Sequence, residues 1–365
     1  MVLASLNRHR ARGPLHGRQA WLIAMIALAV ALAASLLWAV TIGSVGISVA
    51  DVYGVIAYHV AGIGDAASYA DGTKMGDIVW QVRLPRLVLA IAVGAALSAV
   101  GCVMQAVVKN PLADPYILGV SSGAQLGATL AILLGVGSAL GAGYDGVMAF
   151  IGAFLASMAV VGMANVGGRS TSIKLVLSGT ALAAICGAIS NFLLFVVNTN
   201  DGAVAAVVRW TMGSLAPANW DTNVIVLAIS VAGALFFWSQ YRTLNMMLLG
   251  DEVAVTLGAD LSRRRILYLA VASLLVGFAV YAAGIIGFVG LVVPHAVRIL
   301  FGTDHKKLIP LASLTGAIFL LWADVLSRTV IPQHEIPIGI LTALVGAPVF
   351  VYLMVRRSYG FGEDK

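Results

Sequence analysis

The sequence predicts an all-α protein that crosses a membrane about ten times. Three observations carry this prediction: the composition, the length of the apolar stretches and the distribution of positive charge. Apolar residues make up 60% of the 365 residues, charged residues make up 10%, and 40 residues are glycine. Soluble domains carry more charge, whereas a bilayer surrounds helices with hydrocarbon and favours apolar side chains on their outer surface. The composition therefore predicts a membrane protein.

Ten apolar stretches follow one another along the chain, each about as long as the roughly 20 residues that a helix needs to cross the hydrocarbon core. They cover residues 20–42, 86–108, 117–137, 146–166, 174–197, 221–240, 266–283, 285–301, 308–327 and 338–355. The first stretch is too long for the core of a signal peptide, and no clear cleavage site follows it. We therefore expect it to be a retained span.

The seventh and eighth stretches form one nearly continuous apolar run, residues 266–301. As a single helix this run would be about 54 Å long, whereas a bilayer with its headgroups is about 45 Å thick. The run is therefore predicted to fold back, and Gly284, Gly287 and Gly290 mark the place.

The positive charges predict the orientation, because Lys and Arg collect on the cytoplasmic side of membrane proteins. With the N-terminus inside and an even number of spans, seventeen of the 22 Lys and Arg residues fall in cytoplasmic segments. The five on the outside are Lys74, Arg83, Arg86, Arg209 and Arg328. An odd number of spans would place either the basic head or Arg356 and Arg357 on the wrong side. Both termini are therefore expected in the cytoplasm.

One transmembrane domain is expected at residues 20–357. A basic cytoplasmic segment, residues 1–19, precedes it, a cytoplasmic tail, residues 358–365, follows it, and residues 241–265 form a cytoplasmic segment within it. A weak internal repeat pairs Leu177–Leu182 with Gly339–Leu344, five spans further on. Five spans reverse the orientation, as in transporters built from inverted repeats.

The acidic residues argue against a transporter driven by an ion gradient, which generally needs an ionisable group near the middle of the bilayer. The 16 Asp and Glu residues lie in loops or at helix ends, and Asp324 is the nearest to an exception. Hydroxyl and carbonyl oxygens could still bind sodium, so an ion-coupled secondary transporter stays as the alternative from a different class. The chain has no Gly-x-x-x-x-Gly-Lys-Ser/Thr phosphate loop. We expect it to be no enzyme and to draw its energy from another subunit.

Several short motifs between about residues 80 and 357 resemble those of one known family in their order and spacing. They include Arg83-Leu84-Pro85-Arg86, Asn110-Pro111-Leu112-Ala113-Asp114-Pro115, Gly287-Phe288-Val289-Gly290-Leu291-Val292-Val293-Pro294-His295 and Pro337-Ile338-Gly339-Ile340-Leu341-Thr342. The family comprises the permease subunits of ABC importers for ferric siderophores, haem and cobalamin, the FecCD type. The resemblance implies a type II ABC importer permease fold, a homodimer around a central pathway, and a bacterial inner membrane.

The same resemblance implies the partners and the cargo. Two cytoplasmic ATP-binding subunits would hold ATP and Mg, and a periplasmic or lipid-anchored substrate-binding protein would deliver the cargo outside. Lipid surrounds the chain, and no nucleic acid, resident cofactor, catalytic residue or metal site is expected. Cys102 and Cys186 are interpreted as packing residues. The expected cargo is an iron chelate, either haem or a ferric siderophore, with cobalamin as the alternative.

The cytoplasmic segment contains a candidate for coupling. Residues 249–260 have the pattern of a short amphipathic helix, which either docks on a soluble partner or lies among the headgroups. The resemblance favours docking on the ATPase. It implies that the contacts are made by Gly250, Glu252, Ala254, Leu257 and Gly258.

Three arginines are candidates for binding-protein docking. Arg83, Arg86 and Arg328 lie at the outer ends of spans, against the positive-inside bias. Interfacial arginines can simply extend toward the headgroups. The resemblance implies that these three receive carboxylates from the binding protein, a use in which steering and orientation matter more than net energy.

The remaining candidates lie along the pathway. The resemblance implies a cytoplasmic gate of Asn110 and Leu112 opposite Thr171 and Ser172, although these residue types are also typical of a turn and a helix cap. Arg209 lies in a predicted short outer helix at the pathway mouth. There it could bind a carboxylate such as a haem propionate, and a plain surface role is the alternative.

Overall fold

The computed structural model describes residues 17–166, 171–197, 201–250 and 261–356, and all of their regular structure is helical. The elements are α2 (Arg18–Ala39), α3 (Val49–Ala61), α4 (Ala66–Tyr69), α5 (Lys74–Gly76), the π-helix η1 (Asp77–Arg83), α6 (Leu84–Val108), the 3₁₀ turn η2 (Pro115–Leu118), α7 (Val120–Leu134), the 3₁₀ turn η3 (Ser138–Leu140), α8 (Tyr144–Asn165), α9 (Ser172–Val196), α10 (Asp201–Thr211), α11 (Trp220–Ser239), α12 (Tyr241–Leu248), α14 (Leu261–Ala283), α15 (Val289–Phe301), α16 (His305–Ser327) and α17 (Ile338–Arg356).

A helix lies at each of the ten predicted spans. Within the described residues, seven helical runs are long and apolar enough to cross a membrane: Arg18–Ala39, Lys74–Val108, Tyr144–Asn165, Ser172–Val196, Trp220–Ser239, Arg263–Ala283 and His305–Ser327. The other three predicted spans correspond to the shorter apolar helices Val120–Leu134, Val289–Phe301 and Ile338–Leu353. The prediction of an all-α, multi-pass membrane protein is confirmed.

The long apolar run folds back where it was predicted to do so. α14 ends at Ala283 and α15 begins at Val289. Gly284 has a φ of +68°, and a Cβ at this position would lie 2.7 Å from the carbonyl oxygen of Trp210. Only glycine combines this left-handed conformation with so close a neighbour. Gly290, by contrast, lies inside α15, where it packs against α6.

The core surrounds α6, whose residues are buried along most of their length. Glycines let the neighbouring helices approach its backbone, as membrane interfaces favour. A Cβ on Gly94 of α6 would overlap the carbonyl of Gly316 in α16, and a Cβ on Gly101 would overlap the carbonyl of Gly290 in α15. These contacts hold α6, α15 and α16 together as one block.

Replacing Gly316 with valine is expected to lower the free energy of unfolding by about 3 kcal/mol, because the new side chain would overlap Ser98 and the backbone of Gly94. The matched control is Gly162→Val in α8, since a Cβ there has no neighbour within 4 Å. Heat unfolding in detergent, followed by size exclusion, compares the two. Equal unfolding temperatures for both variants would contradict the packing described here.

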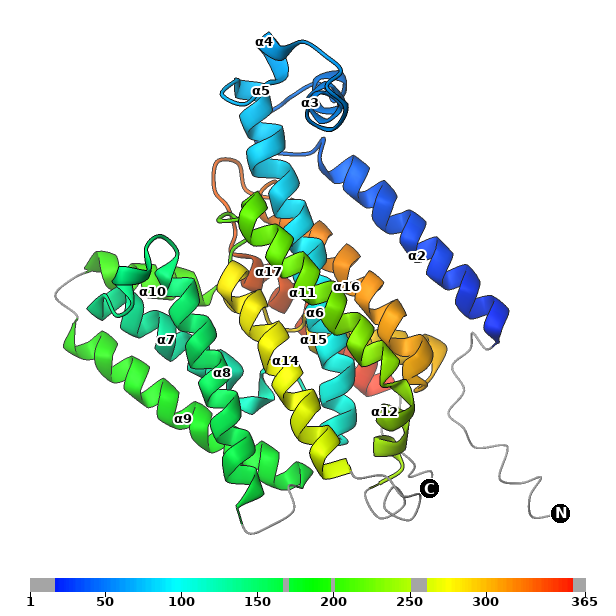
Figure 1. Ribbon diagram of the computed structural model, residues 1–365, viewed down its shortest axis with the longest axis vertical. Coiled ribbons are helices and arrows are strands. Elements are labelled where there is room, and N and C mark those ends of the chain that lie inside the picture. Colours follow the sequence, from blue (N-terminus) through cyan, green and yellow to red (C-terminus); the bar gives the residue numbers. More distant parts are fainter. Residues whose placement is uncertain (1–16, 167–170, 198–200, 251–260, 357–365) are drawn as a thin grey trace.

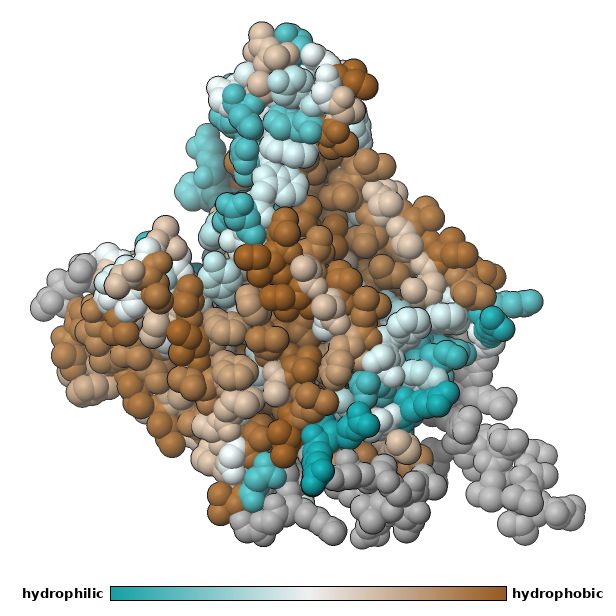
Figure 2. Space-filling view, in the orientation of Figure 1, coloured by the Kyte–Doolittle hydropathy of each residue, from teal (hydrophilic) through white to brown (hydrophobic). Residues whose placement is uncertain are grey.

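The molecule has two polar ends and an apolar middle. In Figure 1, α3, α4 and α5 form a projection at one end, which we call the tower, and α12 lies at the other end. Figure 2 shows a broad apolar belt between a polar tower and a polar edge over α12. We name the two ends the tower face and the α12 face.

Candidate functional site

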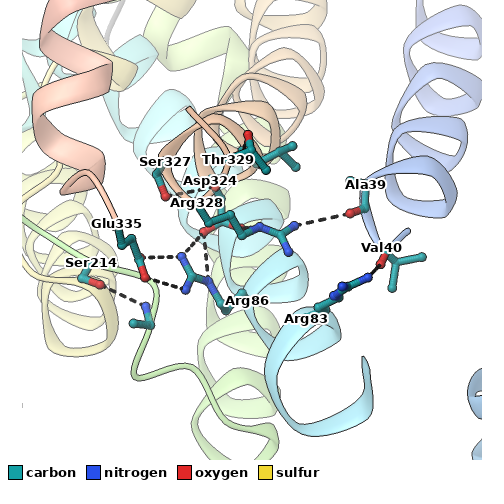
Figure 3. A network of polar contacts seen from close by, with 12 residues as sticks. Ala39, Val40, Arg83, Arg86, Ser214, Asp324, Ser327, Arg328, Thr329 and Glu335 are labelled. Carbon is teal, nitrogen blue, oxygen red and sulfur yellow. Dashed lines mark hydrogen bonds and ion pairs between the residues drawn. The ribbon is translucent and has the colours of Figure 1, made fainter. Parts of the chain in front are cut away.

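Two arginines of one helical run and a third from the end of α16 meet at the base of the tower (Figure 3). Arg83 ends η1, Arg86 lies in the first turn of α6, and Arg328 directly follows α16. Together they line a cavity of about 240 Å³, which Glu335 and His334 also border. The predicted docking arginines are thus neighbours in space, although Arg328 is far from the other two in sequence.

Arg86 is held by two carboxylates of its own chain. Its Nε and Nη2 donate to Oδ1 of Asp324, at 3.1 and 2.8 Å. Its Nη1 and Nη2 donate to the two carboxylate oxygens of Glu335, at 3.0 and 2.6 Å. This is the two-pronged geometry in which a guanidinium and a carboxylate bind most strongly.

Asp324 also forms an ion pair with Arg328, and the two residues lie one helical turn apart. Arg328 Nε lies 3.3 Å from Asp324 Oδ2, and Arg328 Nη2 donates to the carbonyl of Ala39 at 3.4 Å. The Asp324 side chain is 0% exposed, so its charge depends on these two cations. Asp324 thus links the end of α16 to the start of α6, and Arg328 continues the connection to the end of α2.

Arg83 binds backbone rather than carboxylates. Its Nη1 donates to the carbonyls of Val40 and Thr41, at 3.0 and 3.3 Å, and its Nη2 donates to the carbonyl of Val45. Arg83 is only 2% exposed. Its guanidinium therefore ties the chain that leaves α2 to the top of α6.

The predicted docking set is thus brought together, but its side chains are largely buried and have partners inside the chain. Whether they also receive a partner's carboxylates stays a prediction. Reasoning from sequence missed Glu335 altogether and noted Asp324 only as the most embedded acid. One signal was present: an acid four residues before Arg328 in an apolar helix is the spacing of an intrahelical ion pair.

The four predicted gate residues lie at the α12 face, where the chain leaves α6 and enters α9. Ser172 Oγ donates to the carbonyl of Val107 at 3.4 Å, so the two sides are in contact. Asn110 Oδ1 accepts from the amide of Leu112 at 2.9 Å, and Thr171 Oγ1 accepts from the amide of Lys174 at 3.3 Å. The turn and the helix cap are confirmed, and the role as a gate stays a prediction.

The predicted coupling residues lie mostly outside the described residues. Gly250 is described and has a φ of +104°, whereas Glu252, Ala254, Leu257 and Gly258 fall in residues 251–260. The helix before them, α12, is attached to the start of α16. Asn245 donates to Asp304 Oδ1 at 2.8 Å and accepts from the amide of His305 at 2.9 Å.

Arg209 lies in α10, so the predicted short outer helix is present, and it ends at Thr211. Its side chain is exposed and borders a cavity of about 720 Å³. Tyr144, Trp210 and Tyr281 contribute aromatic walls to this cavity, and Asp145 contributes an acid. The structure therefore places the predicted pathway-mouth residue at a hollow wide enough for a large organic ligand.

The cysteine and histidine side chains do not gather into a set of metal ligands within the described residues. Cys102 and Cys186 are buried, as predicted for packing residues. Within the described part of the chain, no group of three or more His, Cys, Asp and Glu residues could hold a metal ion. His295 lies in α15 with its ring edge-on to Phe350, at 6.1 Å between ring centroids, and His334 is exposed in the loop before α17.

Comparison with known proteins gives consistent matches. Residues 23–356 match the model of the FecCD transport family. The cobalamin import permease BtuC of Halobacterium salinarum is 43% identical over 281 residues, which are 77% of this chain and 74% of that protein. The hemin transport permease HmuU of Yersinia pestis is 38% identical over 291 residues, 78% of this chain and 86% of that protein. An inward-facing ABC transporter described as being of the metal-chelate type superposes with a TM-score of 0.75 at 29% identity, covering 91% of this chain and 99% of that chain.

Proposed function

The chain belongs to the FecCD transport family of ABC importer permeases, and on that premise we propose that it carries an iron chelate into the cell. Haem or a ferric siderophore is the cargo, and the membrane is a bacterial inner membrane. The hemin permease of Yersinia pestis supports haem, whereas the cobalamin permease of Halobacterium salinarum supports the alternative, cobalamin. Sequence similarity therefore does not choose between haem and cobalamin, and the choice depends on the residues of the site.

The observation that carries the choice of haem is Arg209 beside the larger cavity. An exposed guanidinium pairs strongly with a carboxylate, and haem offers two propionates. Aromatic side chains such as Trp210 and Tyr281 suit the face of a planar ring. Cobalamin carries neutral amides around its ring and a single phosphodiester in its nucleotide loop, so it offers Arg209 no carboxylate beside the ring.

Growth on defined nutrients tests this proposal. A strain that lacks the gene is grown on haem, on ferric siderophores and under cobalamin-dependent conditions in turn. Loss of growth on one iron source, with cobalamin-dependent growth intact, is the expected result. Loss of cobalamin-dependent growth alone would overturn the choice of cargo, and gradient-driven uptake by the permease without any ATPase would overturn the importer itself.

Replacing Arg209 with glutamine is expected to lower haem uptake about tenfold, because the variant loses a charge-assisted hydrogen bond to the cargo. Arg209→Lys, which keeps the charge, should retain more of the uptake. Lys74→Gln removes another exposed cation of the tower face and serves as the control for general electrostatics. Uptake of radiolabelled haem into cells measures the effect. Equal uptake by Arg209→Gln and Lys74→Gln would argue against a role at the pathway mouth.

The assembly that we propose contains two copies of this chain, two ATP-binding subunits and a substrate-binding protein. The exposed basic residues Arg242, Arg264 and Lys306 lie close together around the start of α12, which supports a cytoplasmic position for the α12 face. Residues 251–260 would then meet the ATP-binding subunits, and both termini would lie in the cytoplasm. The tower face would point outward and receive the binding protein.

Docking of the binding protein is assigned to the three-arginine cavity. Guanidinium groups that line a polar cavity are suited to carboxylates from a partner. Arg86 and Arg328 offer such groups at the cavity wall, and Arg83 supports the wall by holding the chain after α2. The cavity supports this proposal because it gives a partner's carboxylates a way to reach arginines that are otherwise buried.

A further inference from the structure

The two carboxylates that bind Arg86 differ in how exposed they are to solvent and in the kind of segment that carries them. The Asp324 side chain is completely buried in α16 and also serves Arg328. The Glu335 side chain is 34% exposed and lies in the loop between α16 and α17. Figure 3 shows the two on different sides of the Arg86 guanidinium. Only Glu335 can be replaced without opening the core.

An incoming carboxylate would meet Arg86 where Glu335 now lies. Arg86 and Glu335 border the same cavity of about 240 Å³. Glu335 contacts both Nη atoms of Arg86, while Nε and Nη2 face Asp324. One edge of a guanidinium binds one carboxylate in the two-pronged geometry. A partner's carboxylate therefore competes with Glu335 directly.

The chain that follows Glu335 leads to the mouth of the larger cavity. The amide of Ile336 donates to the carbonyl of Ser327 at 2.9 Å. The amides of Ile338 and Gly339 then donate to the carbonyls of Gly213 and Met212, at 3.2 and 3.0 Å. These bonds attach the start of α17 to the chain that follows α10. The chain that follows Glu335 is thus hydrogen-bonded to the segment that follows Arg209.

We propose that Glu335 is an internal stand-in for a carboxylate of the binding protein. Glu335 binds the Arg86 guanidinium while the permease is alone, and a carboxylate of the binding protein replaces it there when the binding protein docks. The proposal rests on the docking function proposed above. The exchange keeps Arg86 paired at every stage, so that no buried cation is left without a carboxylate. It also links docking to the start of α17.

Replacing Glu335 with glutamine tests the exchange, because the amide keeps the shape of the side chain and removes its charge. The affinity of the permease complex for the purified substrate-binding protein of the same importer is expected to rise about tenfold, mainly through slower dissociation. Glu335→Asp, which keeps the charge, is expected to stay within about twofold of the wild type. The measurement uses the complete importer in lipid nanodiscs over immobilised binding protein.

The control is Asp221→Asn at the start of α11. This variant also removes one negative charge from an exposed position, but Asp221 is not a partner of Arg86. The variant should therefore change the affinity for the binding protein by less than about twofold, through long-range electrostatic steering alone. Equal tightening by Asp221→Asn and Glu335→Gln, or no tightening by Glu335→Gln, would overturn the exchange.

A spin label gives a second readout that needs no partner. Gln333→Cys places the label in the exposed loop, and the two native cysteines are buried. In the permease alone, the label should be more mobile in the Glu335→Gln background than in the wild-type background. Equal mobility would overturn the proposal, whereas failure of even the wild type to bind any binding protein would count against the docking function only.

Discussion

Replacing Asp324 with asparagine is expected to lower the free energy of unfolding by about 3–5 kcal/mol. The change leaves Arg86 and Arg328 with one carboxylate between them, and that carboxylate, Glu335, contacts only Arg86. Arg328 would then be a largely buried cation, 8% exposed, without its counter-charge. We expect the variant to unfold at a markedly lower temperature in detergent and to accumulate poorly in the membrane.

Asp221→Asn provides the comparison for this prediction, because it makes the same chemical change at an exposed position of the tower face. It should unfold like the wild type. Asp324→Glu is a further useful variant, since it keeps the charge but lengthens a completely buried side chain. An Asp324→Asn protein as stable as the wild type would show that the arginines do not depend on this acid.

Reversing the charge of Glu252 to lysine is expected to lower ATP-driven uptake by more than about tenfold, whereas the basal ATPase activity and the folding of the complex are retained. The reason is that Glu252 belongs to the segment proposed to dock on the ATP-binding subunits. A reversed charge at such a contact weakens the coupling between the ATP-binding subunits and the permease. It does not disturb the packing of the transmembrane helices.

The matched variant for coupling is Glu252→Asp, which keeps the charge and should retain uptake. Uptake into proteoliposomes and ATP hydrolysis are measured on the same preparation, so that their ratio reports the coupling. An unchanged ratio in Glu252→Lys would contradict the assignment of this segment. A parallel loss of hydrolysis, uptake and assembled complex would point instead to a role in assembly.

The attachment of α12 to α16 connects these two predictions. Asn245 binds Asp304 and His305 at the start of α16, and Asp324 lies near the other end of the same helix. α16 therefore has one end at the arginine cluster and the other beside the helix that precedes the proposed coupling segment. Its close contact with α6 through Gly94 and Gly316 makes the pair suited to move as one unit.

Most helices could be predicted because hydropathy is a property of each segment alone. The fold-back at Gly284 followed from length, since no helix of about 54 Å fits a bilayer. The second span was placed correctly but begun too late. The helical run starts at Lys74 rather than at residue 86, because polar residues between them ended the apolar stretch while the helix continued into the tower.

The candidate site was predicted less completely. The sequence singled out Arg83, Arg86 and Arg328 as unusual, because their side of the membrane conflicts with the positive-inside bias. It placed them at the outer ends of spans, and the structure shows that they are largely buried and bind groups of their own chain. The partners of Arg86 lie 238 and 249 positions away in sequence, at Asp324 and Glu335. No local pattern reports such a pairing.

The sequence by itself determined that this protein is a multi-pass helical membrane protein, where its spans lie and which arginines are exceptional. These properties depend on the transfer of single segments into a bilayer and on the count of charges beside them. Only the tertiary structure decided that Arg86 is shared by a fully buried acid and a partly exposed one, and that Arg83 binds backbone instead. The physical reason is that the free energy of a buried charge depends on the groups beside it in space. Those neighbours exist only once the helices have packed.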